Sequence, residues 1–170
     1  MIAALVRPAS RPTPLGRWLL RGAAAGAAGT TALNAVTYLD MAVRGRAASS
    51  TPEHSVAKVA DAVRLSIPGG AEARQNRLSG LGALMGLVVG TSAGAALGAL
   101  HAAGLRLPVV PEAVAVALGV MASTDTPMAA LGVSDPRSWS VSSWLSDVLP
   151  HAAYGAVSAW TLHELAGRER

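Results

Sequence analysis

Four ionisable side chains fall inside otherwise apolar stretches of the chain: Asp40, Asp125, Asp147 and His151. An ionisable group in the middle of a membrane helix costs about 2.5–3.5 kcal/mol on insertion scales, so it marks a candidate functional site. Carboxylates and imidazoles also change protonation readily when they are desolvated or paired. We therefore predict a polar cluster of these residues, with Asn34 as a further member, toward one side of a bilayer.

Each of these residues also has a structural interpretation. Asp40 would pair with Arg44, four positions later on the same helical face. Asp125 would cap a helix restarting at the Thr-Pro pair that follows it. Asp147 would lie in the first turn of a helix, where the dipole favours an acid. His151 would form a hydrogen bond between helices.

The sequence predicts no metal site, no cofactor and no catalytic residue. It contains no cysteine, which excludes a disulfide framework, a thiolate metal site and a cysteine nucleophile. It shows no pair of metal ligands at HxxxH or ExxH spacing on one helix, no phosphate-binding loop and no Ser-His-Asp spacing. His101 is interpreted as the end of a span, with its ring directed to the membrane surface. An enzyme is therefore less expected than a protein without catalysis.

The elements that would position the polar cluster are four long apolar stretches. Hydrophobic residues form 51% and charged residues 14% of the 170 residues, against about 25% charged in soluble proteins. Such stretches are long enough to cross about 30 Å of hydrocarbon. We predict an all-α polytopic membrane protein with one bundle at 15–166 and flexible tails at 1–14 and 167–170. Its spans are expected at about 15–43, 78–103, 109–132 and 144–165.

The long connection after the first span contains a predicted amphipathic helix at about 52–67. Ser50, Thr51, Pro52 and Glu53 resemble a capping box with proline at the first helical position. Apolar residues follow at helical spacing, and a Pro-Gly-Gly sequence ends the pattern. This helix would lie on the membrane surface or serve as a plain connector.

Glycine recurs every fourth residue through the second predicted span. Small residues let membrane helices approach closely, because no hydrophobic force draws helices together in lipid. The first span has a similar face, so we predict that these two antiparallel helices pack together within one chain. Contact between copies in a homo-oligomer or larger membrane complex is the alternative. The packing glycines are Gly22 and Gly26 in the first span and Gly82, Gly86, Gly90, Gly94 and Gly98 in the second.

Aromatic and basic residues border the apolar stretches. Trp18, Tyr38, Trp139 and Trp144 lie where an interfacial belt would place them. Basic residues lie at the edges of apolar runs rather than in a stripe, which favours a lipid bilayer over nucleic acid as partner. With four spans the 14 Lys and Arg residues divide equally between the two sides, so orientation is not predicted. A cleaved signal peptide is the alternative interpretation of the first span.

Two segments resemble known membrane proteins: Trp144 to Gly155, following the Asp135–Trp139 loop, and Tyr38 to Arg46. Both resemble small uncharacterised actinobacterial four-helix membrane proteins. The last span is also distantly similar to the YagU-like inner-membrane family, which carries an acid and a histidine near the start of its final helix. The resemblance implies a multi-pass protein of the bacterial inner membrane and brings no established activity.

These observations favour an integral membrane protein with a structural or accessory role. The alternative is a small transporter or channel for protons, a cation or a small polar solute. In that alternative Asp40, Asp125 and His151 would converge in a polar cavity on one side of the bilayer.

Overall fold

The computed structural model describes residues 14–167, and within them it contains five α-helices, one 3-10 turn and no strand. The predicted all-α class is therefore confirmed, while residues 1–13 and 168–170, which make up most of the predicted tails, lie outside the described residues. The elements are α1 (Pro14–Arg44), α2 (Thr51–Ala62), α3 (Ala71–Ala102), α4 (Val109–Ala130), η1 (Pro136–Ser138) and α5 (Val141–Gly167).

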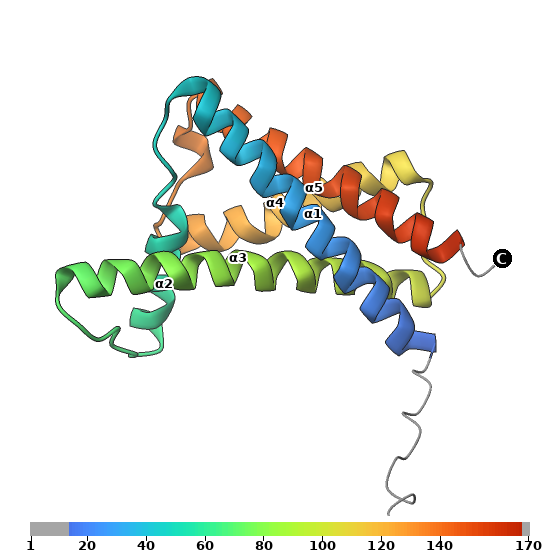
Figure 1. Cartoon of the computed structure of the whole chain (residues 1–170), viewed down its shortest axis with the longest axis horizontal. Coiled ribbons are helices and arrows are strands. Elements are labelled where there is room, and N and C mark those ends of the chain that lie inside the picture. Colours follow the sequence, from blue (N-terminus) through green and yellow to red (C-terminus); the bar gives the residue numbers. More distant parts are fainter. Residues whose placement is uncertain (1–13, 168–170) are drawn as a thin grey trace, which may run out of the picture.

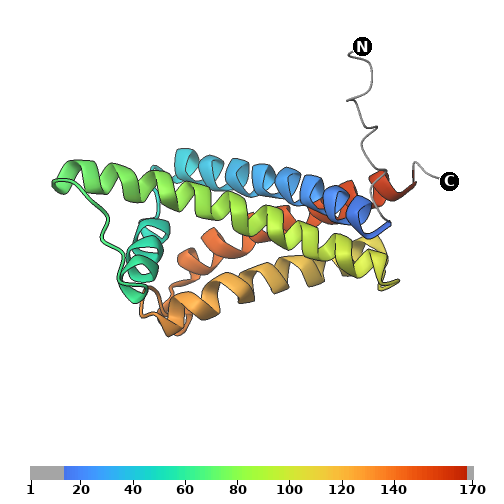
Figure 2. The same ribbon diagram turned by 90° about the horizontal axis from the view of Figure 1, so that it is seen from below.

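The four long helices extend along the long axis of the molecule, and α2 lies across one end (Figure 1). Helix α1 packs against both α3 and α5, α4 packs against α5, and α2 packs against α3. Helices α3 and α4 have few contacts with each other, and they diverge away from the turn that joins them (Figure 2). We call the end with the 103–108 turn the histidine end. The opposite end, with α2 and the 131–140 loop, is the aspartate end.

Helices α1 and α3 touch through their backbones near the histidine end. A Cβ atom on Gly22 would meet the backbone of Gly94 and Gly98, and one on Gly26 would meet the backbone of Gly90 and Gly94. These positions exclude any larger side chain unless the helices separate. The close approach supplies dispersion contacts that small side chains alone could not make.

The other glycines of α3 have different neighbours. Gly90 faces the side chain of Thr30, and Gly82 faces Pro52 of α2. A Cβ on Gly86 would meet nothing within 4 Å. The regularly spaced glycines of α3 therefore have three kinds of neighbour: some face α1, one faces α2 and one faces open space.

Helix α5 joins the α1–α3 pair through two buried hydroxyl groups. The Tyr154 hydroxyl donates to the Gly90 carbonyl at 2.6 Å, and the Ser158 hydroxyl donates to the Ala25 carbonyl at 3.3 Å. Both side chains have no exposed surface, and they pack against Gly29. These contacts make α5 part of the core.

Helix α2 departs from its predicted extent and cap. It ends at Ala62, not near residue 67, because Arg64 adopts a left-handed conformation (φ 57°) that stops the helix. Ser50 makes no side-chain capping bond. Glu53 instead accepts a hydrogen bond from Ser79 at 3.0 Å, which ties α2 to α3.

Two of the long helices also differ from expectation. Helix α3 begins at Ala71, seven residues before the predicted start of its span, and α4 continues through Asp125 and Pro127 to Ala130. The interpretation of Asp125 as the cap of a restarting helix is therefore wrong. Asp147 is the seventh residue of α5, so it lies beyond the first turn where the dipole would favour it most.

Among the described residues, α3 and α4 are the helices long and apolar enough to cross a membrane by length and composition. Their most apolar windows have mean hydropathies of 1.7 and 1.3. This finding supports the coarse prediction of a membrane protein. The crossing of α1 and α5 stays a prediction.

Candidate functional site

The structure divides the predicted polar cluster into two groups at the aspartate end. Asp40 belongs to the first group, where its carboxylate accepts hydrogen bonds from Arg44 at 2.7 Å and Arg46 at 2.5 Å. Arg44 also donates to Ser142 and Ser146 at the start of α5. Asp40 thus pairs with Arg44, as its structural interpretation expects, and Arg44 in addition joins the end of α1 to the start of α5.

The second group consists of Asp125 on α4 with Asp147 and His151 on α5. The His151 ring nitrogen Nδ1 donates to the Asp147 carbonyl at 2.8 Å and lies 3.3 Å from its carboxylate. Asp125 lies close enough for the charges of both residues to act on it. One carboxylate oxygen each of Asp125 and Asp147 is buried without a hydrogen-bond partner.

Asn34 joins neither group. Its side chain is half-buried on α1, and its side-chain amide forms no hydrogen bond with the described residues. The five predicted residues therefore lie in the half of the molecule toward the aspartate end, and they do not form one site.

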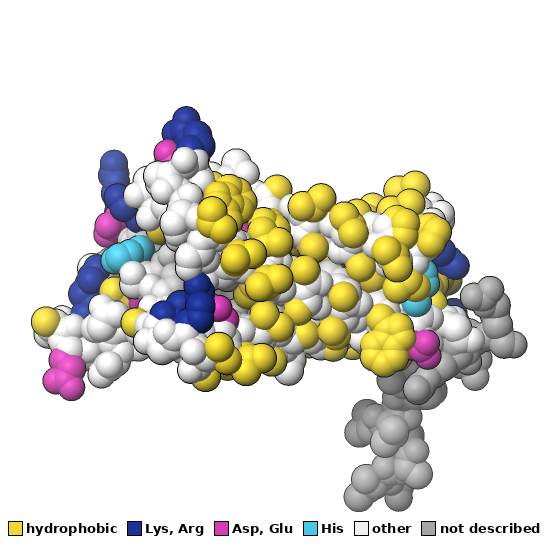
Figure 3. Space-filling model, turned by 90° about the horizontal axis from the view of Figure 1, so that it is seen from above, with side chains coloured by type: hydrophobic (Ala, Val, Ile, Leu, Met, Phe, Trp, Pro, Cys, Tyr) yellow, Lys and Arg dark blue, Asp and Glu magenta, His cyan; other side chains and the backbone are white. Residues whose placement is uncertain are grey.

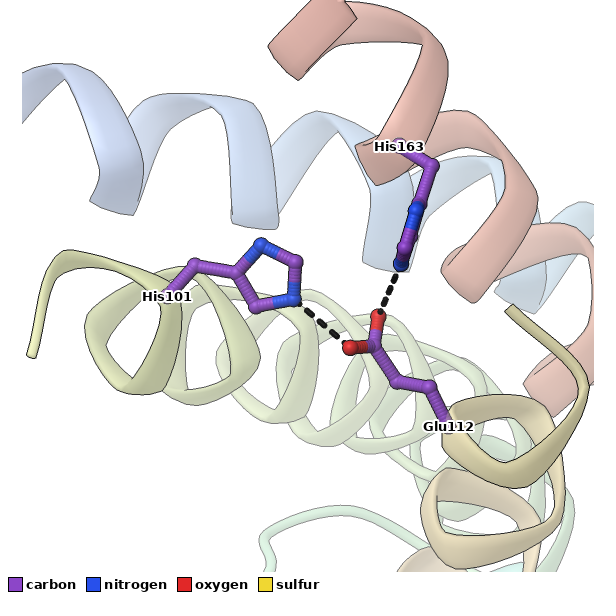
Figure 4. Close-up of side chains that lie close together, drawn as sticks. All are labelled: His101, Glu112 and His163. Carbon is purple, nitrogen blue, oxygen red and sulfur yellow. Dashed lines mark hydrogen bonds and ion pairs between the residues drawn. The ribbon is translucent and has the colours of Figure 1, made fainter. Parts of the chain in front are cut away.

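A third cluster, at the opposite end, brings together His101, Glu112 and His163 from three helices (Figure 4). The His101 nitrogen Nε2 lies 2.7 Å from one oxygen of Glu112, and the His163 Nε2 lies 3.3 Å from the other. His101 is 1% exposed and Glu112 is 3% exposed. The interpretation of His101 as a surface-directed end residue is therefore wrong.

The 103–108 turn places two members of this cluster opposite each other. Helix α3 ends one residue after His101, and Gly104 takes a left-handed conformation (φ 84°) that reverses the chain. Pro108 then precedes the first turn of α4, and Glu112 lies in that turn. Helix α5 adds His163 from its last turns.

Trp18 of α1 closes the cluster on the fourth side. Its ring lies 5.4 Å from the His101 ring, and the guanidinium groups of Arg106 and Arg21 lie 4.8 Å and 5.3 Å from the Trp18 ring centroid. Cations over an aromatic face are attracted by its quadrupole. Trp18 therefore contacts the buried imidazole and two arginines, one of which also donates a hydrogen bond to the His101 carbonyl at 3.3 Å.

The chemistry open to this cluster follows from its burial. A carboxylate withdrawn from water needs charged or hydrogen-bonding partners, since an unpaired buried charge is strongly destabilising. Two imidazole nitrogens directed at the carboxylate can share protons with it or act with it as ligands of a metal ion. The His163 side chain is 29% exposed, while its Nε2 atom, which faces Glu112, is buried.

Glu112 and His163 were not predicted as site residues. Glu112 stands near the start of an apolar stretch, where an acid is ordinarily favourable to the helix dipole. His163 is near the end of the last stretch, 51 positions later in the sequence. The one available signal was that His101 and Glu112 flank a turn marked by Gly104 and Pro108, which brings their helices together.

Comparison of this chain with protein-family models, with curated proteins and with solved structures finds no match.

Proposed function

We propose that this chain is an integral membrane protein of the bacterial inner membrane in which α1, α3, α4 and α5 each cross the bilayer. Its role is structural or accessory, without catalysis. Its partner is the lipid bilayer, and the four helices form one bundle per chain. The proposal starts from the coarse membrane assignment and extends it to four spans.

The observation that carries the proposal is the exposure of large apolar side chains along the middle of the molecule. Only 22% and 17% of the most apolar windows of α3 and α4 are buried, whereas a core helix of a soluble protein buries most of such a window. Figure 3 shows apolar side chains over the middle of one face, with most charged side chains toward the two ends. This pattern is expected of a surface that contacts hydrocarbon.

The lengths of the helices support four crossings. The shortest, α4, has 22 residues, and the longest, α3, has 32. At a rise of 1.5 Å per residue these are about 33 and 48 Å long, against a hydrocarbon core of about 30 Å. Charged residues are absent from positions 22–39 of α1 and 78–100 of α3.

Cysteine reporters test the proposal, because the chain has no cysteine of its own. Single variants Ser134→Cys, Leu105→Cys and Gly167→Cys are labelled in intact cells with a membrane-impermeant maleimide, and again after lysis. Four spans place Gly167 on the side of Leu105, opposite Ser134. Crossing by α3 and α4 alone places Gly167 on the side of Ser134.

Leu15→Cys makes the same distinction for α1, since four spans place it on the side of Leu105. Fractionation supplies the coarser test. We expect the unmodified chain to stay in membranes after alkaline carbonate and to need detergent for extraction. Recovery as a monodisperse protein without detergent would overturn the proposal.

A second candidate function is passage of protons or a small cation past Asp125, Asp147 and His151. The observation in its favour is the pair of buried, unpartnered carboxylate oxygens on Asp125 and Asp147. Pro127 and Pro150 lie within α4 and α5 beside these residues, and each removes a backbone N–H donor from its helix.

Proteoliposome flux tests this second function. Asp125→Asn keeps the size of the side chain and removes its charge, so proton or cation flux should fall at least about tenfold if the carboxylate carries the ion. Asp135→Asn, on the 131–140 loop, is the matched control and should leave flux unchanged. Equal flux in the wild type, both variants and empty vesicles would eliminate transport.

A further inference from the structure

We propose that His101, Glu112 and His163 form a binding site for one divalent transition-metal ion of the Zn²⁺ class. The ligands are the two Nε2 atoms and the Glu112 carboxylate. The site would fasten the ends of α3, α4 and α5 together at the histidine end. This inference goes beyond the proposed membrane role and is independent of transport at the aspartate end.

The ligand set matches a known chemistry of zinc. Two histidines and one glutamate are a common set of three protein ligands, with a fourth position left for water or another molecule. One potential ligand atom from each residue lies within 4.8 Å of the other two. The three atoms therefore need only small side-chain rotations to surround one ion.

Two atoms of the cluster are arranged as ligands rather than as a hydrogen-bonded pair. The Glu112 oxygen Oε1 and the His163 nitrogen Nε2 are buried, and neither has a hydrogen-bond partner, although they lie 3.3 Å apart. Ligand atoms on a tetrahedral ion with bonds of 2.0–2.1 Å are about 3.3 Å from each other. Their spacing and burial therefore suit a shared ion.

Burial gives a reason for a cation at this point. Glu112 is 3% exposed, and a carboxylate at such depth is costly unless its charge is compensated. A divalent ion would provide this compensation.

Aromatic rings pack against the first ligand, and the side chain of the third ligand is partly exposed. The Trp18 ring packs at 5.4 Å from the His101 ring, and the His163 ring meets the His101 ring edge-on at 5.6 Å. The His163 side chain is 29% exposed, although its Nε2 atom is buried, so entry of an ion requires this side chain to move.

The test uses the full chain in detergent, freed of any polyhistidine tag and stripped with a chelator. Zn²⁺ is added in competition with a chromophoric chelator at pH 7.5. We expect one ion per chain in the wild type, and at least about tenfold weaker binding in Glu112→Gln and His163→Ala. His54→Ala is the matched control, because His54 is exposed on α2 and outside the cluster. It should bind as the wild type does.

A second measurement keeps the test valid if a variant folds poorly. A ligand that binds only the folded state raises its stability, so Zn²⁺ at a hundredfold excess over its Kd should raise the wild-type Tm by about 5–10 °C. Glu112→Gln should show no such rise. Co²⁺ in place of Zn²⁺ should give the visible absorption of a tetrahedral ion.

Three results would overturn the site. The first is that the wild type binds Zn²⁺ no more tightly than a His101→Ala/His163→Ala double variant. The second is that Glu112→Gln binds Zn²⁺ as tightly as the wild type. The third is that the wild-type Tm responds to neither Zn²⁺ nor chelator. Each would identify the cluster as a hydrogen-bonded contact among helices. None of them would affect the topology that the cysteine reporters test.

Discussion

The two ends of the bundle treat a carboxylate in opposite ways. At the histidine end, Glu112 is 3% exposed and faces two ring nitrogens. At the aspartate end, the Asp40 side chain is 21% exposed and is held by Arg44 and Arg46. Arginine stays charged and keeps its own hydration partly intact, whereas histidine can gain or lose a proton or bind a metal.

The helices also pack more closely at the histidine end than at the aspartate end. Near the histidine end α1 and α3 touch through glycine, and His101 follows directly after this contact. Toward the aspartate end Gly86 meets nothing within 4 Å, and α2 covers Gly82 through Pro52. The tight end thus buries Glu112 almost completely, and the looser end leaves Asp40 partly exposed. The surroundings of a carboxylate in this bundle therefore differ with how closely the helices around it pack.

Replacing Gly94 with leucine should give the largest effect. The new side chain would collide with the backbone of Gly22 and Gly26, so we expect a loss of about 3 kcal/mol or more in the free energy of unfolding. Unfolding in mixed micelles of mild detergent and dodecyl sulfate measures it. Gly86→Leu, at the open position eight residues earlier in α3, should change it little. Equal losses in both variants would contradict the difference in packing.

Removing one imidazole tests the difference in burial. His101→Leu leaves Glu112 buried with His163 alone, and we expect a loss of about 3 kcal/mol. Asp40→Asn removes a partly exposed ion pair, which is ordinarily worth about 1 kcal/mol or less. The same unfolding assay, run with chelator present, compares them. A cost for Asp40→Asn equal to that for His101→Leu would show that the two clusters are equally desolvated.

A smaller effect should come from the middle of the bundle. Tyr154→Phe removes the hydrogen bond to Gly90, so the free energy of unfolding should fall by about 1 kcal/mol. Tyr38 is 63% exposed, and Tyr38→Phe is the matched control with no expected loss. If Tyr154→Phe left the free energy of unfolding unchanged, packing of the ring rather than the hydroxyl hydrogen bond would hold α5 against α3.

The smallest effect should be electrostatic and lie in the 131–140 loop. The side-chain and backbone N–H groups of Arg137 donate to Asp135 and hold the pKa of that carboxyl below its ordinary value of 3.8. A lowered pKa in the folded state stabilises the fold at pH values above the ordinary pKa of the carboxyl. This contribution disappears as the pH falls through the folded-state pKa. Asp135→Asn should therefore lower the Tm slightly at pH 7 and not at pH 2. A difference that grows in acid would contradict this sign.

Much of the fold could be predicted from patterning. Long apolar runs bounded by Gly, Pro and charged residues predicted helices close to α1, α4 and α5, because backbone groups in a continuous apolar segment are satisfied within a helix. The start of α3 was predicted too late, since residues 71–77 are polar and lie outside the apolar run. The end of α2 was predicted too late, because an arginine rather than a glycine takes the left-handed position.

The candidate sites were less predictable. Asp125, Asp147 and His151 stand out in sequence because each interrupts an apolar stretch, and the structure brings these three together. Asp40 lies in a separate group because Arg44 and Arg46 bind it locally. Glu112 and His163 lie at the edges of their stretches, where charged residues are ordinary.

Composition and spacing alone specified a helical chain with too few charged residues to cover a soluble surface, and a glycine face on each of two helices. These properties depend on local residue types and on the 3.6-residue period. Which glycines face which helix, and which histidines meet a carboxylate, depended on how α1, α3, α4 and α5 pack. A contact between residues 51 positions apart has no local sequence signature. The contact between His163 and Glu112 is therefore visible only in the tertiary structure.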